Sequence, residues 1–482
     1  MIRVSRRRFI SGTGAVAAGF VGLHRFLHSP LSGAELSANL KYPVVSRQAH
    51  QSEVDGYGDL LEDPQRILDL PEGFHYTVMS TTGQTMSDGF QVPGAPDGMA
   101  AFPHDSDRVV VVCNHELEDA NTILGPYGIT NDLAKKVPAG KLFDTGKGKR
   151  PQLGGTSNFV YNVKTQKVES HFLSLAGTIR NCAGGPTPWG SWISCEETVF
   201  LAGDHLDHHH GYNFEVPATA KMGLVDPVPL KAMGRFNHEA VAVDPATGIV
   251  YQTEDRDDGL ITRFIPNQPG KLSAGGKLEA LAIRTKASCD TRNWPDKGAT
   301  IISEGDTLEV SWMPIEEPEN LEDTLRADSF KAGATIFARG EGMWYGSGKI
   351  YFACTSGGIA KQGQIFIYEP SPHEGTERED KQPGKLTLYL EPNNTQLLQY
   401  GDNLTISPWG DIILCEDGAS DQYLRGITPE GKIYTLARNS YFGQSELCGV
   451  CFAPDHSTLF VNIQRPGITL AINGPWESLA KG

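Results

Sequence analysis

Short apolar and β-branched runs recur along most of the chain and alternate with polar segments. The runs come in pairs, and Pro, Gly or Asp residues separate the two members of each pair. Each pair predicts a β-hairpin, because β-branched and aromatic residues favour strands and the residues between them favour turns. The six predicted hairpins cover residues 97–116, 181–197, 239–255, 341–356, 402–417 and 448–464. Helical periodicity is scarce by comparison, so the chain is predicted to be all-β.

A third strand-like run follows most of the hairpins, and there is room for a fourth before the next one. Repeated units of about four strands are typical of a β-propeller, so the pattern predicts six blades with inserted loops. The longest predicted insertions are residues 118–155, 267–331 and 371–394. The strand-like segment 74–80 precedes the first unit, and we expect it to complete the last blade and close the ring. A β-sandwich array or a two-domain all-β chain is the alternative.

The first residues have the features of an export signal in the usual order. The sequence Ser5-Arg6-Arg7-Arg8-Phe9-Ile10 is similar to a twin-arginine signal, and the apolar stretch 9–23 follows it. That stretch is shorter than the roughly 18–20 residues of a membrane span. We therefore expect residues 1–38 to be a signal peptide and leader that the twin-arginine translocation machinery reads. A basic tail before a marginal helix is the alternative.

Export would place the protein in the periplasm or outside the cell, without a stable membrane span. Residues 39–90 are then expected to form an N-terminal arm with the ring-closing strand, and residues 91–476 the propeller. The 482 residues carry a net charge of −16, although Arg3, Arg6, Arg7, Arg8 and Arg25 lie in the first segment. Such a chain is not expected to bind nucleic acid by neutralising phosphates. The surplus of carboxylates suits a metal-rich site or, more simply, solubility.

Each predicted hairpin carries an acid or a thiol six positions before the place of its turn proline, which Ser347 occupies in the fourth hairpin. If the first strand of each hairpin is the innermost strand of a blade, these side chains lie at one mouth of the central channel. They are Asp97, Cys182, Glu239, Glu341, Asp402 and Cys448.

The second strand of each hairpin runs back, so its end should lie at the same mouth. The residues there are Asn114-His115-Glu116, Glu196-Glu197, Glu254-Asp255, Thr355-Ser356 and Glu416-Asp417. Carboxylates this crowded repel one another, and bound cations relieve the repulsion. Oxygen ligands suit Ca²⁺ or Mg²⁺, and a thiolate among them suggests iron or zinc. The alternative is that the acids accept backbone hydrogen bonds at strand ends.

The sequence around each cysteine and histidine predicts different roles for them. Cys182 lies in a Gly-rich inner strand and is expected to bind metal, whereas Cys113, Cys195, Cys354 and Cys415 are expected to fill the core. Cys448 and Cys451 form a C-x-x-C pair that suits either core packing or a disulfide. The cluster His205, His208, His209 and His210 is predicted to lie in a solvated loop. His115 and His238 are either ligands or acid/base groups, or structural residues.

Arg339 lies two residues before Glu341 and is the best candidate for a fixed positive charge near the metals. A guanidinium presents a fork of N–H donors that matches two phosphate oxygens. A salt bridge at the rim is the alternative. The chain contains no G-x-S-x-G, P-loop, Rossmann glycine set or H-E-x-x-H, which argues against a serine hydrolase, an NTPase and a zincin.

These motifs resemble those of the PhoX family of bacterial alkaline phosphatases. The segments that carry the resemblance are SRRRFI, VVVVCNHELE, AGTIRNCAGGPTPWGSWISCEET, GRFNHEAVAVDP, ARGEG, GDNLTISPWGDIILCEDG and ELCGVCFAPDHSTLFVNIQRPGIT. The resemblance implies a six-bladed propeller, exported by the twin-arginine route, with a central Fe³⁺ and Ca²⁺ cluster that hydrolyses phosphate monoesters. It implies that Cys182, Glu239 and Glu341 bind iron and that Arg339 binds phosphate. Glu116, Glu196, Glu197 and Asp402 are the further ligands it implies, and the ring pattern adds Asp97.

The predicted function is therefore metal-dependent hydrolysis of small-molecule phosphate esters, with Arg339, Cys182, Glu239 and Glu341 as the catalytic residues. A Ca²⁺-dependent lactonase or phosphotriesterase is an alternative that rests on analogy of fold alone. A second alternative is a non-catalytic, metal-stabilised extracellular scaffold that binds a partner.

Overall fold

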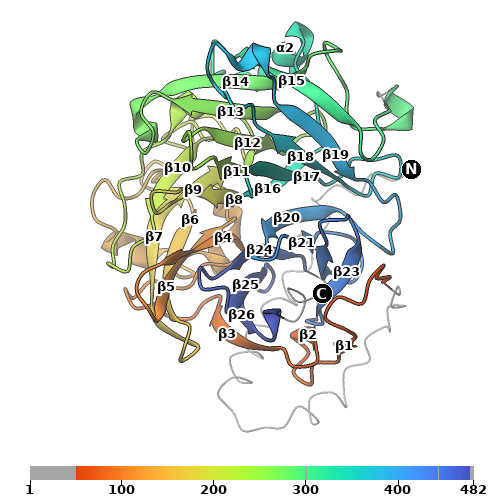
Figure 1. Cartoon of the computed structure of the whole chain (residues 1–482). Helices are drawn as coiled ribbons and strands as arrows, with labels where there is room; N and C mark the ends of the chain where they lie inside the picture. Colours follow the sequence, from red (N-terminus) through yellow and green to blue (C-terminus); the bar gives the residue numbers. More distant parts are fainter. Residues whose placement is uncertain (1–49, 299–300, 443–444, 478–482) are drawn as a thin grey trace.

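Antiparallel strands make up nearly all of the regular structure in the computed structural model, which describes residues 50–298, 301–442 and 445–477 (Figure 1). The predicted export signal lies outside these residues. The first sheet contains β4 (Pro96–Pro103), β5 (Arg108–His115), β6 (Gly154–Asn162) and β7 (Lys167–Thr178). The second contains β8 (Asn181–Pro186), β9 (Ser191–Glu196) and β10 (Asn213–Pro217).

A nine-stranded sheet follows along the chain. Its strands, in spatial order, are β11 (His238–Val243), β12 (Val250–Glu254), β13 (Ile261–Pro266), β14 (Gly276–Ile283), β15 (Thr307–Pro314), β19 (Lys385–Leu390), β18 (Gln364–Glu369), β17 (Lys349–Cys354) and β16 (Gly340–Gly346). The last two sheets both include strands from the N-terminal arm. One contains β1 (Leu60–Leu61), β2 (Leu68–Pro71), β23 (Ile433–Asn439), β22 (Tyr423–Ile427), β21 (Ile412–Glu416) and β20 (Gly401–Ile406), and the other contains β24 (Leu447–Phe452), β25 (Thr458–Ile463), β26 (Ile468–Asn473) and β3 (His75–Thr81).

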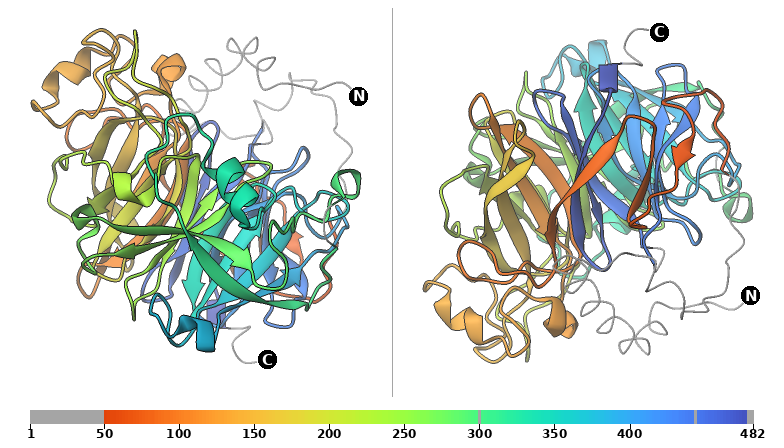
Figure 2. Two further views of the ribbon diagram at one scale, coloured as in Figure 1. Left: turned by 90° about the horizontal axis from the view of Figure 1, so that it is seen from above. Right: turned by 90° about the horizontal axis from the view of Figure 1, so that it is seen from below.

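Helices are short and lie in the connections. In the described residues they are α2 (Leu325–Ala332) and the 3₁₀ turns Asp119–Leu124, Asp132–Lys136, Lys231–Met233, Leu272–Ala274, Pro295–Lys297 and Glu379–Lys381. The segment with the first two of these turns extends beyond the sheets at one side of the molecule (Figure 2). No helix among the described residues has both the length and the apolar character needed to cross a membrane.

The first strands of the predicted hairpins, β4, β8, β11, β16, β20 and β24, line the centre of the molecule. Each lies beside the next in chain order, and β24 lies beside β4, so the ring is closed (Figure 1). The second strand of each hairpin pairs with the outer side of the first. The fold is therefore all-β and propeller-like.

The sheets differ from the six separate blades that the sequence predicted, because the described residues form five sheets. Strand β15 pairs with β14 on one side and with β19 on the other, so two groups of strands become one continuous sheet. Strands β14 and β15 both come from residues 267–331, which the sequence analysis treated as an inserted loop. The insertion therefore adds an outer strand that joins neighbouring groups.

The N-terminal arm closes the ring. The strand predicted at residues 74–80 is β3, and it pairs along its length with β26 near the C-terminus. Strand β2 pairs with β23 and so extends the outer edge of the sheet that contains β20–β23. Segments from the two ends of the chain thus share a sheet.

Apolar side chains fill the space between neighbouring sheets. Ile413, Leu436, Val461 and Leu470 belong to one such layer and have no exposed surface. Fully burying a Leu, Ile or Val side chain contributes about 1.5–3 kcal/mol, so these layers hold the sheets face to face.

The core role predicted for four cysteines is confirmed, because Cys113, Cys195, Cys354 and Cys415 are all free and fully buried. Cys448 and Cys451 are also free and buried, so they form no disulfide.

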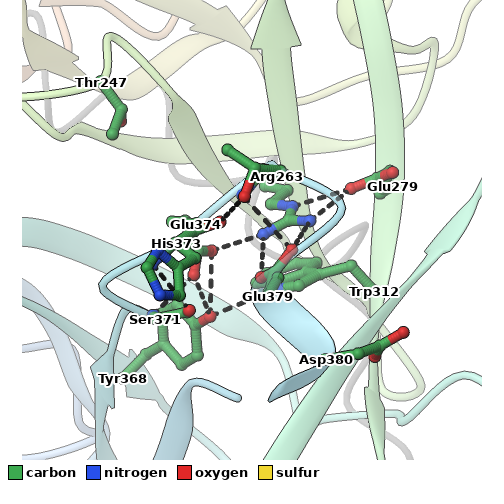
Figure 3. Close-up of polar contacts among 12 residues, drawn as sticks. Thr247, Arg263, Glu279, Trp312, Tyr368, Ser371, His373, Glu374, Glu379 and Asp380 are labelled. Carbon is green, nitrogen blue, oxygen red and sulfur yellow. Dashed lines mark hydrogen bonds and ion pairs between the residues drawn. The ribbon is translucent and has the colours of Figure 1, made fainter. Parts of the chain in front are cut away.

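A buried ionic network fixes the third predicted insertion, residues 371–394, to the nine-stranded sheet. Figure 3 shows Arg263 of β13 surrounded by Glu279 of β14 and by Glu374 and Glu379 of the segment before β19. Nη1 of Arg263 donates to Glu374 and Glu379 at 2.6 Å each, and Nε donates to Glu279 at 2.8 Å. Only 3% of the Arg263 side chain is exposed. One guanidinium therefore ties three carboxylates from two segments together.

Candidate metal centre

The innermost strands share an irregularity at the place where the sequence predicted a ring of ligands. In five of them the pairing register shifts across two residues, and the first of these is the predicted ring residue, namely Asp97, Cys182, Glu239, Glu341 or Asp402. Such a bulge removes a residue from the regular ladder and redirects its side chain. The repeated bulge therefore turns these five side chains to the same mouth.

The sixth strand differs, and this corrects the prediction for Cys448. Cys448 pairs regularly with Asn462, and the bulge follows it at Gly449, whose φ is +67°. The thiol donates to the backbone oxygen of Pro96 at 3.1 Å instead of reaching the ring. A displacement of the bulge by one residue thus removes Cys448 from the ligand set.

Four overlapping groups of ligand-type residues lie at this mouth within the described segments. In each group, one potential ligand atom from every member lies within 4.8 Å of the others. The groups are Asp97, Glu116 and Cys182; Cys182, Glu197 and Glu239; Glu239, Glu341 and Asp402; and Asp402, Asp417 and Glu446. Cys182, Glu239 and Asp402 each belong to two groups, so the four form one continuous centre.

Glu239 lies where two groups meet and is the least satisfied member of the centre. It is 1% exposed, and neither of its carboxylate oxygens has a hydrogen-bond partner. Burial raises the pKa of Glu239 well above its usual range, and the charges of Glu341 and Glu197 raise it further. Two orphaned buried oxygens beside other carboxylates fit a bound cation, which would satisfy both.

Cys182 is the one cysteine of the eight, all of them in the described part of the chain, that is not buried. Desolvation raises the pKa of its thiol well above the usual value, and the nearby charges of Asp97 and Glu239 add to this. The thiol is therefore protonated unless a metal ion binds, since a metal takes the thiolate. Mixed oxygen and sulfur donors fit hard cations together with a transition metal.

Arg339 lies beside the centre, as predicted, and donates to carboxylates. Its Nε donates to Asp255 Oδ1 at 2.7 Å, and Nη2 donates to Asp255 Oδ2 at 2.9 Å and to Glu341 Oε1 at 2.6 Å. Burial alone lowers the pKa of Arg339, but Glu341 and Asp255 raise it above that of free arginine. The guanidinium is therefore a permanent positive charge at the mouth.

Glu196, which was predicted as a further ligand, lies outside the four groups. Oε1 accepts from the backbone N–H of Ile179 at 2.9 Å and contacts Nδ1 of His210 at 2.6 Å, and Oε2 accepts from Gly211 N–H at 2.9 Å. It is the last residue of β9, and Glu254 and Glu416 end β12 and β21 in the same way. These strand-end acids bind backbone, whereas the residues that follow them face the mouth.

The histidine predictions also change. His210 is fully buried between Glu196 and Asp144, not solvated, although His205 of the same cluster is exposed. Burial alone lowers the pKa of His210, but the two carboxylates outweigh it and raise the pKa to about 9. His115 contacts Gly94 O and Ser157 Oγ, and His238 contacts Gly234 O, so both have structural partners away from the four groups.

Sequence reasoning missed Glu446, which belongs to the centre, and Arg180, which contacts it. Both lie two residues before a predicted ring residue, the position that Arg339 occupies in its own repeat. Comparing that position across the repeats would have found them, because it holds Ala95, Arg180, Asn237, Arg339, Tyr400 and Glu446. The backbone carbonyl of each accepts the N–H of the residue that follows the second strand, for example Glu197 N–H to Arg180 O at 2.8 Å.

A family model described as alkaline phosphatase PhoX matches residues 55–467. The chain belongs to the PhoX alkaline phosphatase family. The PhoX match covers nearly the whole chain and includes every member of the four groups. A search of curated proteins finds no match.

Several solved structures are similar to this PhoX family member at low identity. The β-propeller domain of Cps50 (Swd1) from Myceliophteria thermophila is 9% identical with a TM-score of 0.39, and the alignment covers 83% of this chain and 100% of that one. A luciferin-regenerating enzyme is 9% identical with a TM-score of 0.38, with 83% and 96% covered. A Bacteroides thetaiotaomicron VPI-5482 protein of unknown function is 8% identical with a TM-score of 0.38, with 83% and 76% covered.

Proposed function

We propose that this protein hydrolyses phosphate monoesters at a centre of iron and calcium ions held by the four groups. The observation that carries the proposal is Glu239, whose two buried oxygens have no partner and face the other members of the centre. Membership of the PhoX family supplies the reaction class.

The donor types suggest how the cations divide. Cys182, Glu239 and Glu341 would hold iron, because a thiolate among carboxylates suits a transition metal. Glu116, Glu197, Asp97 and Asp402 would hold calcium, since Ca²⁺ prefers several oxygen ligands in a flexible arrangement. Asp417 and Glu446 extend this oxygen-rich side.

When bound, the cations would neutralise the charge of the phosphoryl group and favour attack by an oxygen nucleophile. The protein's own contribution is binding and orientation. Arg339 keeps its proton, and its Nη1 makes no hydrogen bond within the described chain, so two N–H groups remain for phosphate oxygens. Cys182 would lose its thiol proton when iron binds.

The same ring of strands supports six blades as the finer description of the fold. The nine-stranded sheet would be two blades, β11–β14 and β16–β19, that share β15 at their outer edges. Six inner strands would then each supply one position to the mouth.

Release of p-nitrophenol from p-nitrophenyl phosphate tests the activity. Protein loaded with Fe³⁺ and Ca²⁺ should hydrolyse the ester at alkaline pH, and chelator-treated protein should not. Hydrolysis of lactones or phosphotriesters in preference to monoesters would support the alternative enzyme, and tight metal binding without turnover of any ester would support a scaffold.

Replacing Cys182 with Ser should remove iron while most calcium remains, because the alkoxide of serine forms far less readily than a thiolate. Activity should fall at least about 100-fold, since changing even an indirect metal partner often costs 10–100-fold. Elemental analysis and the p-nitrophenyl phosphate assay measure both effects, and Cys451→Ser is the control from the core. Full iron content and activity in Cys182→Ser would contradict the assignment.

We also propose export by the twin-arginine route to the periplasm or beyond, on the basis of the SRRRFI segment. Fractionation of cells that express the chain with Arg6 and Arg7 replaced by Lys should find the protein in the cytoplasm. Normal export of that variant would reject the route.

A further inference from the structure

Arg180 and Arg339 occupy the same position in two different repeats. Each lies two residues before a member of the centre, Cys182 or Glu341, and each has a left-handed backbone, with φ of +50° and +52°. The exposed fractions of the two side chains are 24% and 25%. They are the two basic residues at this position among the six repeats in the described chain.

The two guanidinium groups also bind carboxylates in the same way. Nε and Nη2 of Arg180 donate to Glu116 Oε1 at 3.0 and 2.7 Å, and Nη2 also donates to Glu197. Arg339 uses the same two nitrogens for Asp255 and Glu341. In both side chains Nη1 has no hydrogen-bond partner in the described structure and is not buried. Each arginine thus presents two unused N–H donors at the mouth.

The arginines lie at different parts of the centre. Arg180 contacts Glu116 of the first group and Glu197 of the second, whereas Arg339 contacts Glu341 of the third. Two carboxyl groups separate them, because Glu197 is hydrogen-bonded to Asp255, which binds Arg339. The unused donors of the two arginines therefore lie on opposite sides of the Glu197–Asp255 pair.

We propose that Arg180 binds a second anionic group of the substrate, so that the preferred substrates are phosphate monoesters whose leaving group carries another phosphate. This inference rests on the proposed function, in which Arg339 holds the transferred phosphoryl group. A guanidinium held by two carboxylates keeps its charge and its orientation, which makes it a preorganised oxyanion donor. A purely structural role would leave substrate choice unchanged.

The experiment compares ligands that differ in the second anion alone. Propyl phosphate and propane-1,3-diol bisphosphate are the substrates for the metal-loaded protein, and propylphosphonate and propane-1,3-bisphosphonate are the inert ligands for calorimetry. The native protein should favour the bis-anion by about tenfold or more in kcat/KM and in Kd, as expected for a charge-assisted hydrogen bond. Arg180→Ala should remove most of this preference, and Arg180→Lys should keep part of it.

Elemental analysis of each variant separates substrate binding from metal binding, and Arg438→Ala is the control because that arginine pairs with Asp69 outside the centre. If Arg180→Ala loses metal, the inference is tested by the preference of Arg180→Lys and Arg180→Gln for the bis-anion over the mono-anion. A preference that these variants retain unchanged overturns the inference, and so does native protein that binds both phosphonates equally. Hydrolysis of p-nitrophenyl phosphate by that same native protein would still support the proposed function, so the two failures are distinguishable.

Discussion

At the scale of single residues, the centre is built from groups that are unfavourable without a cation. Glu239 has two unpartnered buried oxygens, and the Cys182 thiol is surrounded by carboxylates. Removing a buried polar group's partner costs about 1–3 kcal/mol, and charged groups cost more. Such residues lower the stability of the empty fold, which is expected of a binding site and not of a core.

The substitution Glu239→Gln tests whether a residue of the centre lowers the stability of the metal-free fold. The amide removes a charge from a crowded, buried place, so the metal-free protein should gain about 1 kcal/mol of unfolding free energy, or about 1 °C in melting temperature. The metal-loaded variant should instead melt below the loaded native protein and hydrolyse esters poorly. Scanning calorimetry with and without metal shows both effects, and a metal-free variant that is less stable than native would contradict the role given to Glu239.

At the scale of elements, the bulge in each innermost strand decides which side chains reach the mouth. The sequence revealed the repeat and its acids, because both recur at a constant distance from the turn. It did not reveal that the bulge falls one residue later beside Cys448, since bulges depend on local pairing that the side-chain pattern does not encode. Glu446 enters the centre from the residue before β24, where no hairpin signal pointed.

The ionic network at Arg263 should contribute strongly to the stability of the nine-stranded sheet. Arg263→Met would leave Glu279, Glu374 and Glu379 without their shared cation, and breaking a buried pair in this way costs about 3–5 kcal/mol. Urea unfolding measures the loss. Arg108→Met is the matched control, because its pair with Asp105 is about two-fifths exposed and should contribute little to stability. Equal effects of the two substitutions would reject the prediction.

The loop between β9 and β10 should loosen in alkaline solution. The pKa of His210 is about 9 in the fold, above the value of about 6.5 for an unfolded chain. The folded state therefore binds this proton more tightly, so the stabilisation is complete below about pH 6.5 and is lost as the pH rises through 9. The hydrogen-exchange protection factors of residues 199–211, which are corrected for the intrinsic base catalysis of exchange, should fall over that range. In His210→Gln these protection factors should stay constant with pH.

At the scale of the whole molecule, the sequence predicted an all-β, propeller-like ring and the place of its mouth. The reason is that six hairpins repeat a pattern of strand, turn and ligand that needs no knowledge of distant contacts. The continuous nine-stranded sheet could not be predicted, because β15 lies in a non-repeating insertion and its two partners are far apart in the chain. Arg180 was overlooked because its role depends on neighbours from two repeats, Glu116 and Glu197.

Chelation should destabilise the entire fold, since ligands from all six repeats meet at one place. At a free metal concentration of 1,000 times Kd, binding contributes about 4 kcal/mol per site, so the melting temperature should fall by roughly 4 °C for each site that loses its metal. Burial raises the pKa values of Asp97, Glu239, Glu341 and Asp402 in the fold. Their protonated forms therefore support the metal-free fold below about pH 4, and this support is lost as the pH rises.

The difference between loaded and chelated melting temperatures should accordingly widen from acidic to neutral pH. Calorimetry at several pH values measures it, with sodium chloride added to the chelated sample as a control for ionic strength. A constant difference across that range would show that the carboxylates of the mouth do not repel one another in the absence of metal.

The pairing of β3 with β26 also has a consequence for biosynthesis. Residues 75–81 leave the ribosome long before their partner, residues 468–473. A chain that ends before residue 468 therefore lacks the pairing of β26 with β3, even when every member of the four groups up to Glu446 has been synthesised. The pairing that joins the N-terminal arm to the last sheet can therefore form only after residues 468–473 have been synthesised.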